Sequence, residues 1–178
     1  MHIGMVGLGK MGMNLVANMR DHDIEVTAFD LNDKAREEVG QYGAKAVASL
    51  DALVMSLASP RIIWSMVPAG KPTEATISQL AKLLRPDDIV IDGGNSYYQD
   101  SIAHGKLLAV EGIHFFDVGT SGGMAGARTD GNFMIGGDKA IFNKIEPMFK
   151  AIAAKGGYLY TGPAGSGHYL KMIHNGIE

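Results

Sequence analysis

Short apolar runs alternate with longer amphipathic stretches along the whole chain. A short apolar run predicts a buried strand, whereas apolar residues that recur every three or four positions predict a helix. We expect strands at residues 3–6, 24–30, 45–47, 62–67, 89–91, 114–118, 132–135 and 158–160. We expect helices at residues 13–20, 33–42, 50–56, 73–84, 101–110 and 139–153. This alternation predicts an α/β fold with a doubly wound, mostly parallel sheet and helices on both faces.

The composition is that of an ordinary globular protein. The chain has 178 residues, of which 46% are hydrophobic and 20% are charged. A domain of this length buries roughly 70% of its unfolded surface. The net charge of −3 provides no positive field, so we expect neither nucleic acid nor an anionic membrane as a partner. The absence of cysteine excludes disulfides and cysteine-ligated metals.

The apolar runs also bear on location and on metals. None approaches the roughly 18 residues needed to cross a bilayer. No charged leader precedes the first expected strand, so we expect no secretory signal and a cytoplasmic location. His2, His22 and His104 lack the paired spacing of metal ligands, and we expect no metal site. The position of His168 beside a glycine-flanked helix start predicts a cap-like structural role.

A glycine-rich turn joins the first expected strand to the first expected helix. Gly7 permits the tight turn, Gly9 lets the backbone approach a pyrophosphate, and Gly12 allows close packing of helix on strand. The start of the helix offers free amide donors to the phosphates. An ordinary turn between strand and helix is the weaker alternative. We therefore predict a Rossmann-type dinucleotide site with cofactor contacts from Gly7, Leu8, Gly9, Lys10, Met11 and Gly12.

Asp30 ends the second expected strand and indicates which dinucleotide is bound. An acidic residue there accepts hydrogen bonds from the adenosine ribose hydroxyls. It also repels a 2′-phosphate, and no arginine immediately follows it, so NAD is favoured over NADP. Lys34 is near enough in the sequence to leave NADP open.

Two further loops follow the strands expected at 62–67 and 89–91. Ends of strands on this side of a doubly wound sheet face the cofactor crevice. The first loop predicts cofactor contacts from Met66, Val67 and Pro68, although a plain turn with Pro68 and Gly70 would explain it too. In the second loop, Asn95 is a donor and acceptor for cofactor or substrate, or alternatively the cap of the next helix.

The loop expected at residues 119–123 is rich in glycine and hydroxyl groups. Its consecutive amides and hydroxyls suit a nest for a carboxylate or a phosphate. Turn glycines without a ligand are an equally good explanation of this loop alone. Four such loops at one edge of the sheet favour a binding site.

The last eight residues, KMIHNGIE, place four polar side chains at helical spacing. Lys171, His174, Asn175 and Glu178 fall on one face of a helix. The lysine and the glutamate are candidates for a base and an acid acting on one substrate. Without the upstream loops, an exposed ion pair would be the better interpretation.

Five segments together carry a family resemblance: GLGKMG, MVPAG, DGGNS, GTSGGMAGAR and KMIHNGIE. They resemble 6-phosphogluconate dehydrogenase, a decarboxylating family in the β-hydroxyacid dehydrogenase superfamily. The resemblance covers the whole chain, and the last two segments are the specific ones. Pro68 departs from the lysine common in the long NADP-type enzymes. With Asp30, it makes the chain more similar to the short, often NAD-preferring branch.

The resemblance implies an activity and residue roles. The activity is NAD(P)-dependent oxidative decarboxylation of 6-phosphogluconate to ribulose 5-phosphate and CO2, in the pentose phosphate pathway and gluconate utilization. Lys171 would be the base that takes the proton from the substrate C3 hydroxyl, and Glu178 the acid that protonates C1 of the product, ribulose 5-phosphate. The implied substrate-binding residues are Asn95, Ser121, Gly122, Gly123, His174 and Asn175.

The resemblance also implies a domain division. Residues 1–165 would form the NAD(P)-binding Rossmann-like domain, and residues 166–178 the start of the interdomain catalytic helix. The family's all-helical C-terminal domain, with its substrate-phosphate ligands and homodimer interface, has no counterpart within the 178 residues. We therefore expect a weakly ordered last turn, NAD binding and poor turnover. Two alternatives stay open: another β-hydroxyacid dehydrogenase, such as one for 3-hydroxyisobutyrate, or a catalytically silent NAD-binding module.

Overall fold

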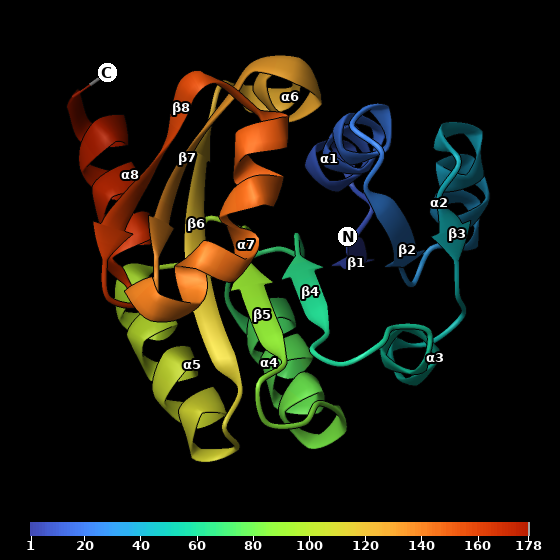
Figure 1. The fold of residues 1–178 in the computed structure, drawn as a ribbon, viewed down its shortest axis with the longest axis horizontal. Coiled ribbons are helices and arrows are strands. Elements are labelled where there is room, and N and C mark those ends of the chain that lie inside the picture. Colours follow the sequence, from blue (N-terminus) through green and yellow to red (C-terminus); the bar gives the residue numbers. More distant parts are fainter. Residues whose placement is uncertain (178) are drawn as a thin grey trace.

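One sheet of eight strands organises the computed structural model, which describes residues 1–177 (Figure 1). The strand order across the sheet is β3-β2-β1-β4-β5-β6-β7-β8. The pairs from β3 to β6 are all parallel, β7 is antiparallel to β6, and β8 is parallel to β7. The strands are β1 His2–Val6, β2 Glu25–Phe29, β3 Lys45–Ala46, β4 Ile62–Ser65, β5 Ile89–Asp92, β6 His114–Ser121, β7 Gly131–Gly136 and β8 Ala153–Gly162. The predicted α/β, doubly wound, mostly parallel architecture is confirmed.

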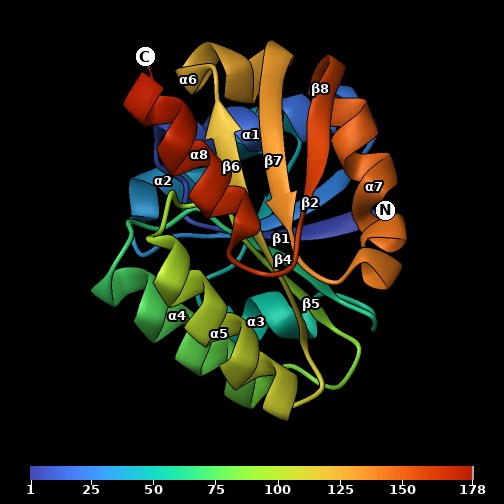
Figure 2. The same ribbon diagram turned by 90° about the vertical axis from the view of Figure 1, so that its left-hand side faces the viewer.

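Helices cover both faces of this sheet, as Figure 2 shows for α3, α4, α5 and α8 on one side and α7 on the other. Among residues 1–177, no helix combines the length and the apolar character needed to cross a membrane. The helices are α1 Lys10–Asp21, α2 Asp33–Glu38, η1 Val39–Tyr42, α3 Leu50–Met55, α4 Lys71–Leu83, α5 Tyr98–Val110, α6 Gly123–Ala125, η2 Gly126–Asp130, α7 Lys139–Ile152 and α8 Ser166–Ile177.

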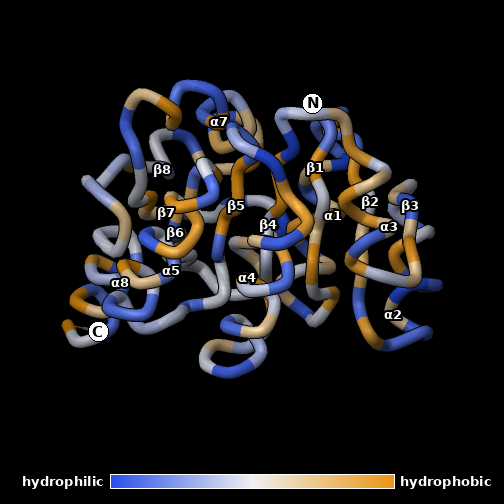
Figure 3. Tube along the Cα trace, turned by 90° about the horizontal axis from the view of Figure 1, so that it is seen from below, coloured by the Kyte–Doolittle hydropathy of each residue, from blue (hydrophilic) through white to orange (hydrophobic). Residues whose placement is uncertain are grey.

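Each face of the sheet has its own apolar core. Side chains alternate between faces along a strand, so neighbouring residues such as Ile63 and Trp64 enter different cores. Under α1 and α7, the ring of Trp64 lies 5.4 Å from that of Phe149 and 6.1 Å from that of Phe133. Burial on both faces explains why residues 3–6 of β1 and 89–91 of β5 carry no polar side chain (Figure 3).

Several element boundaries differ from the sequence prediction. Helix α4 starts at Lys71 instead of Thr73, because Pro72 fits the first turn of a helix, where no amide donor is required. Helix α5 starts at Tyr98 instead of Ser101. Strand β8 runs over ten residues, Ala153–Gly162, because it pairs along β7 and not only at its apolar centre.

The largest difference concerns the loop expected at residues 119–123. Gly119, Thr120 and Ser121 belong to β6, because they pair with residues 132–134 of the antiparallel strand β7. The expectation of a loop was therefore wrong for these three residues. The turn starts only at Gly122, and α6 and the π-helical turn η2 follow it, neither of which the apolar pattern indicated.

Asp88 lies at the end of the sheet where β4 and β5 begin, and it binds the segments that lead into both strands. Its buried carboxylate accepts hydrogen bonds from the Ser59 hydroxyl (2.9 Å), the backbone amides of Arg61 (2.7 Å) and Arg85 (2.9 Å), and the Arg61 guanidinium (3.2 Å). Burial alone raises the pKa of Asp88, but these donors outweigh it and hold the pKa below its usual value.

We predict that Asp88→Asn lowers the free energy of unfolding by about 2–3 kcal/mol at pH 7, because hydrogen bonds to a buried charge are lost. The folded pKa lies below the unfolded value of about 3.9, so the contribution of Asp88 is complete above that pH. It is lost as the pH falls through the folded pKa. Urea unfolding of both proteins between about pH 2 and 7 measures this. A stability difference that persists unchanged in acid would contradict it.

Candidate functional site

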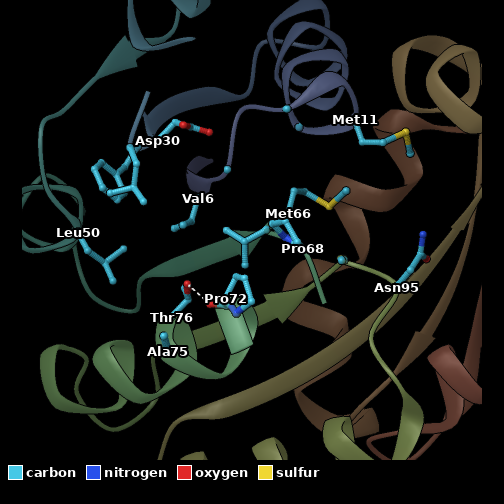
Figure 4. Close-up of a pocket in the computed structure, with 18 of the residues that line it drawn as sticks. Val6, Met11, Asp30, Leu50, Met66, Pro68, Pro72, Ala75, Thr76 and Asn95 are labelled. Atoms are coloured by element: carbon cyan, nitrogen blue, oxygen red, sulfur yellow. Dashed lines mark hydrogen bonds between the residues drawn. The ribbon is translucent and has the colours of Figure 1, made fainter. Parts of the chain in front are cut away.

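A cleft of about 800 Å³ opens at the carboxyl ends of β1, β2, β4 and β5 (Figure 4). Asp30 lies at one end of it and Asn95 at the other, with Met66 and Pro68 between them. Pro72 and Thr76 of α4 complete the wall. The structure brings these predicted cofactor residues together around the cleft: Gly7, Gly9, Lys10, Met11, Gly12, Asp30, Met66, Val67, Pro68 and Asn95.

The three glycines of the first turn meet different surroundings. Gly7 has a φ of +96°, and a Cβ there would lie 2.8 Å from the Met66 carbonyl oxygen. A Cβ on Gly12 would lie 2.1 Å from the Gly7 carbonyl oxygen. A Cβ on Gly9 would meet no atom within 4 Å. Gly7 and Gly12 are thus required by the protein itself, whereas Gly9 leaves room on the cleft side, as a bound pyrophosphate would need.

Asp30 is held firmly at the end of β2. Its carboxylate accepts the backbone amide of Leu8 at 2.6 Å and that of Asn32 at 2.8 Å. Leu8 itself is buried and does not line the cleft. Arg36 donates from Nη1 to the Asp30 carbonyl oxygen at 2.7 Å and forms an ion pair with Asp33. The carboxylate therefore faces the cleft as a fixed acceptor.

Arg36 is a residue that sequence reasoning missed. Asn32 caps α2 by accepting from the amides of Lys34 and Ala35, and the resulting turn of helix brings Arg36 back to Asp30. The Asn-x-x-x-Arg spacing at a helix start was the available signal. Lys34, in contrast, is exposed and does not line the cleft.

The loop after β5 is fixed by the buried carboxylate of Asp92. This carboxylate accepts the Gly94 amide at 2.9 Å and the Ser96 hydroxyl at 2.6 Å. Asn95 between them has a left-handed backbone with φ +56°. The residue that caps α5 is Tyr97, so the alternative role of Asn95 as a helix cap is wrong.

Asn95 also lines a second cavity of about 310 Å³, where it meets Lys171 and Asn175 of α8. Tyr97, Tyr98 and Met172 form the apolar part of its wall. Loss of hydration, and next the neighbouring Tyr98 and Asp100, raise the pKa of Tyr97 above its usual value. Sequence reasoning did not identify the two tyrosines, because adjacent aromatic residues carry no specific chemical signal.

Lys171 lies where α8 crosses β6. A Cβ on Gly119 would lie 2.5 Å from the Cβ of Lys171, so the glycine makes room for the lysine. Ser121 ends β6, and Gly122 turns the chain with φ +98° into Gly123. Neither of the two cavities is lined by Ser121, Gly122, Gly123 or His174, and His174 is exposed. Glu178 lies outside the described residues, so the expectation of a weakly ordered last turn stays a prediction.

Helix α8 is anchored on β6 by a buried polar cluster. Asp117 accepts the amides of Gly165 (2.7 Å) and His168 (2.8 Å) through its two carboxylate oxygens. The predicted cap-like role of His168 is thus corrected: Asp117 caps the helix, and His168 lies inside it. Burial raises the pKa of Asp117, partly offset by His168 and the donated amides. Within the described chain, no three His, Cys, Asp or Glu side chains gather closely enough to hold a metal ion.

Comparison with known proteins places this geometry in a family. The family model described as the NAD binding domain of 6-phosphogluconate dehydrogenase matches residues 2–162. A protein of Bacillus subtilis (strain 168), named as a candidate 6-phosphogluconate dehydrogenase, is 46% identical over the whole chain. An NAD(+)-dependent, decarboxylating 6-phosphogluconate dehydrogenase of Haloferax volcanii is 40% identical, again over the whole chain.

A solved structure agrees with these relatives. The 6-phosphogluconate dehydrogenase of Plasmodium falciparum, known in apo form and with NADP+ or 6-phosphogluconate, matches 99% of the chain with a TM-score of 0.94 and 31% identity. The chain spans 60% and 59% of the lengths of the two relatives and 40% of the Plasmodium chain. Its Rossmann-like fold, the glycine-rich cleft and these matches show that the chain belongs to the NAD-binding domain family of 6-phosphogluconate dehydrogenase.

Proposed function

We propose that the chain is the cofactor-binding part of an enzyme that oxidises and decarboxylates 6-phosphogluconate to ribulose 5-phosphate and CO2. One observation carries the proposal: Asn95 lines both the dinucleotide cleft and the cavity that contains Lys171. A hydride acceptor bound in the first and a hydroxyl bound in the second would therefore be neighbours. That adjacency is what a dehydrogenase with a lysine base requires.

The proposed chemistry assigns a role to each polar group. Bound dinucleotide supplies a nicotinamide that accepts hydride from substrate C3. Lys171 takes the proton of the C3 hydroxyl, and the resulting 3-keto acid releases its carboxylate as CO2, because the β-keto group accepts the electron pair. Glu178, which lies outside the described residues, is proposed to protonate the enediol at the former substrate C2, which becomes C1 of ribulose 5-phosphate.

Substrate binding is proposed for residues around the second cavity. Asn95 and Asn175 line it together with Lys171 and offer amide donors and acceptors. Ser121, Gly122 and Gly123 stand at the end of β6, beyond Gly119, against which Lys171 packs. His174 follows Lys171 by three positions on α8, which puts it on the same side of the helix.

NAD is the proposed cofactor, in preference to NADP. Asp30 presents a fixed carboxylate to the cleft, and a 2′-phosphate beside it would be repelled. The Haloferax relative is named NAD(+)-dependent, while the Plasmodium structure is described with NADP+. The domain division at residue 165, with α8 as the start of an interdomain helix, and a homodimeric whole protein complete the proposal; the start of α8 at Ser166 supports the division.

A pair of glycine substitutions tests the dinucleotide site. Gly9→Ala should leave the free energy of unfolding unchanged, because its Cβ meets no protein atom, but should weaken NAD binding at least tenfold by occupying the pyrophosphate path. Gly12→Ala should lower stability by about 1–3 kcal/mol, because its Cβ meets the Gly7 carbonyl. Titration calorimetry with NAD and urea unfolding measure both effects. Unchanged NAD affinity in folded Gly9→Ala would place the pyrophosphate elsewhere.

Cofactor preference is tested at Asp30. NAD should bind more tightly than NADP to the unmodified chain, and Asp30→Asn should narrow or reverse the difference, because repulsion of the 2′-phosphate is removed. Loss of charged hydrogen bonds to the ribose should weaken NAD binding by roughly 10- to 100-fold. Lys34→Ala serves as the control and should change neither affinity. Tighter binding of NADP to the unmodified chain would refute the assignment.

The reaction is tested through Lys171 in the natural full-length protein. Lys171→Met should reduce NADH formation from 6-phosphogluconate by roughly 10²- to 10⁴-fold while NAD affinity stays within about twofold. Lys144→Met, on the exposed face of α7, is the matched control and should retain activity. CO2 release should equal NADH formation. Oxidation without CO2 release would instead indicate another β-hydroxyacid dehydrogenase.

A further inference from the structure

We propose that His168 is a positioning residue that sets where Lys171 lies, through its contacts with Ser101 and β6. The inference rests on the proposed function, in which Lys171 is the base. The geometry of the contacts stands independently of that function.

His168 is held at both ring nitrogens. Its Nδ1 lies 2.7 Å from the Ser101 hydroxyl on α5, and its Nε2 lies 3.1 Å from the Val118 carbonyl oxygen on β6. Ser101 is fully buried and His168 is 3% exposed. Because a carbonyl only accepts, Nε2 donates to Val118. The Ser101 hydroxyl, which also lies 3.5 Å from the Tyr97 carbonyl oxygen, pairs with Nδ1. One ring orientation satisfies both partners.

Asp117 fixes the same helix along its axis. Its carboxylate accepts the amides of Gly165 and His168 at the start of α8. The next residue of β6, Val118, receives the imidazole, and the one after it, Gly119, receives Lys171. Three consecutive strand residues therefore determine the start, the rotation and the depth of α8.

Lys171 follows His168 by three positions, so both side chains lie on the same side of α8. Both also line the second cavity. A rotation of α8 about its axis would carry Lys171 away from Gly119 and alter the cavity around Asn95. The two imidazole bonds are directional and resist that rotation, which apolar packing alone would not specify.

The cluster resembles the residue set of a hydrolase but cannot work as one. Ser101 is fully buried, so no substrate reaches its hydroxyl. The Asp117 carboxylate lies 3.8 Å from His168 Nδ1, the same nitrogen that Ser101 contacts. A relay would need the serine and the carboxylate on opposite ring nitrogens. The cluster therefore serves geometry and not nucleophilic attack.

Three substitutions separate the two bonds of the imidazole. His168→Leu removes both, His168→Asn retains an acceptor near the Nδ1 position for Ser101, and His168→Gln retains a donor near the Nε2 position for Val118. Gly119→Ala displaces Lys171 without changing either hydrogen-bonding group of the imidazole, although its Cβ would also lie 3.1 Å from the Gly167 carbonyl oxygen. Thr27→Val is the control. Thr27 is a buried polar residue of β2, and among the described contacts its hydroxyl is hydrogen-bonded only to His2.

The first readout is the nuclear Overhauser contact between the Lys171 β-protons and the Gly119 α-protons, recorded without any substrate. We expect it to be strong in the unmodified chain and in Thr27→Val, lost in His168→Leu, and partly restored in His168→Asn or His168→Gln. Where His168→Leu does not fold, Ser101→Ala replaces it, because that change removes a single bond. Persistence of the full contact in a folded variant lacking these bonds would overturn the inference.

The second readout is kcat against KM in the natural full-length protein. His168→Leu and Gly119→Ala should lower kcat by roughly 100-fold, the effect of misplacing a reacting group by about 1 Å, while KM for NAD stays within about twofold. Thr27→Val should retain kcat. If the unmodified protein does not oxidise 6-phosphogluconate, the proposed function fails. The nuclear Overhauser contact between Lys171 and Gly119, recorded without substrate, then still decides whether His168 positions Lys171.

Discussion

A carboxylate buried at the end of a strand must be met by donors, because an unsatisfied buried charge costs several kcal/mol. Two strands of this sheet contain such a group near the site, Asp92 in β5 and Asp117 in β6, and the half-buried Asp30 that follows β2 is held in the same way. The donors are backbone amides and a hydroxyl from the neighbouring loops and from α8. The loops consequently have little freedom, and the cleft and the lysine cavity take the shapes described above.

Much of the fold follows from the spacing of apolar residues. Each of the eight strands within residues 1–177 overlaps a strand expected from the sequence, and stretches such as residues 89–91 of β5 are apolar because both of their faces are buried. The end of β6 was not expected as strand, because Gly119, Thr120 and Ser121 carry no strand pattern and become strand only by pairing with β7. Pairing partners distant in the sequence are invisible to local periodicity. For the same reason the boundary of β8 was set too narrowly.

The candidate site shows a similar division. The glycine turn and Asp30 were predicted because each has a mechanism that reads directly from spacing, and the family is confirmed. The meeting of Asn95 with both cavities, the return of Arg36 to Asp30, and the Ser101–His168 contact all join elements separated in the chain. Sequence alone does not predict the angle at which a helix crosses a sheet or how closely the helix packs on it. The sequence therefore predicted candidate chemical groups, but not the side chains that hold those groups in place.

The reversal of chain direction at β7 has an electrostatic consequence. Because β7 and β8 run opposite to the first six strands, α8 starts beside the middle of β6 and runs toward the edge where α1 begins. The positive end of the α1 macrodipole lies at this edge. An all-parallel sheet would bring only such helix starts there. The reversal instead lays the side of α8 along that edge, so that Lys171, in the middle of the helix, lies at the same edge as a positive helix end.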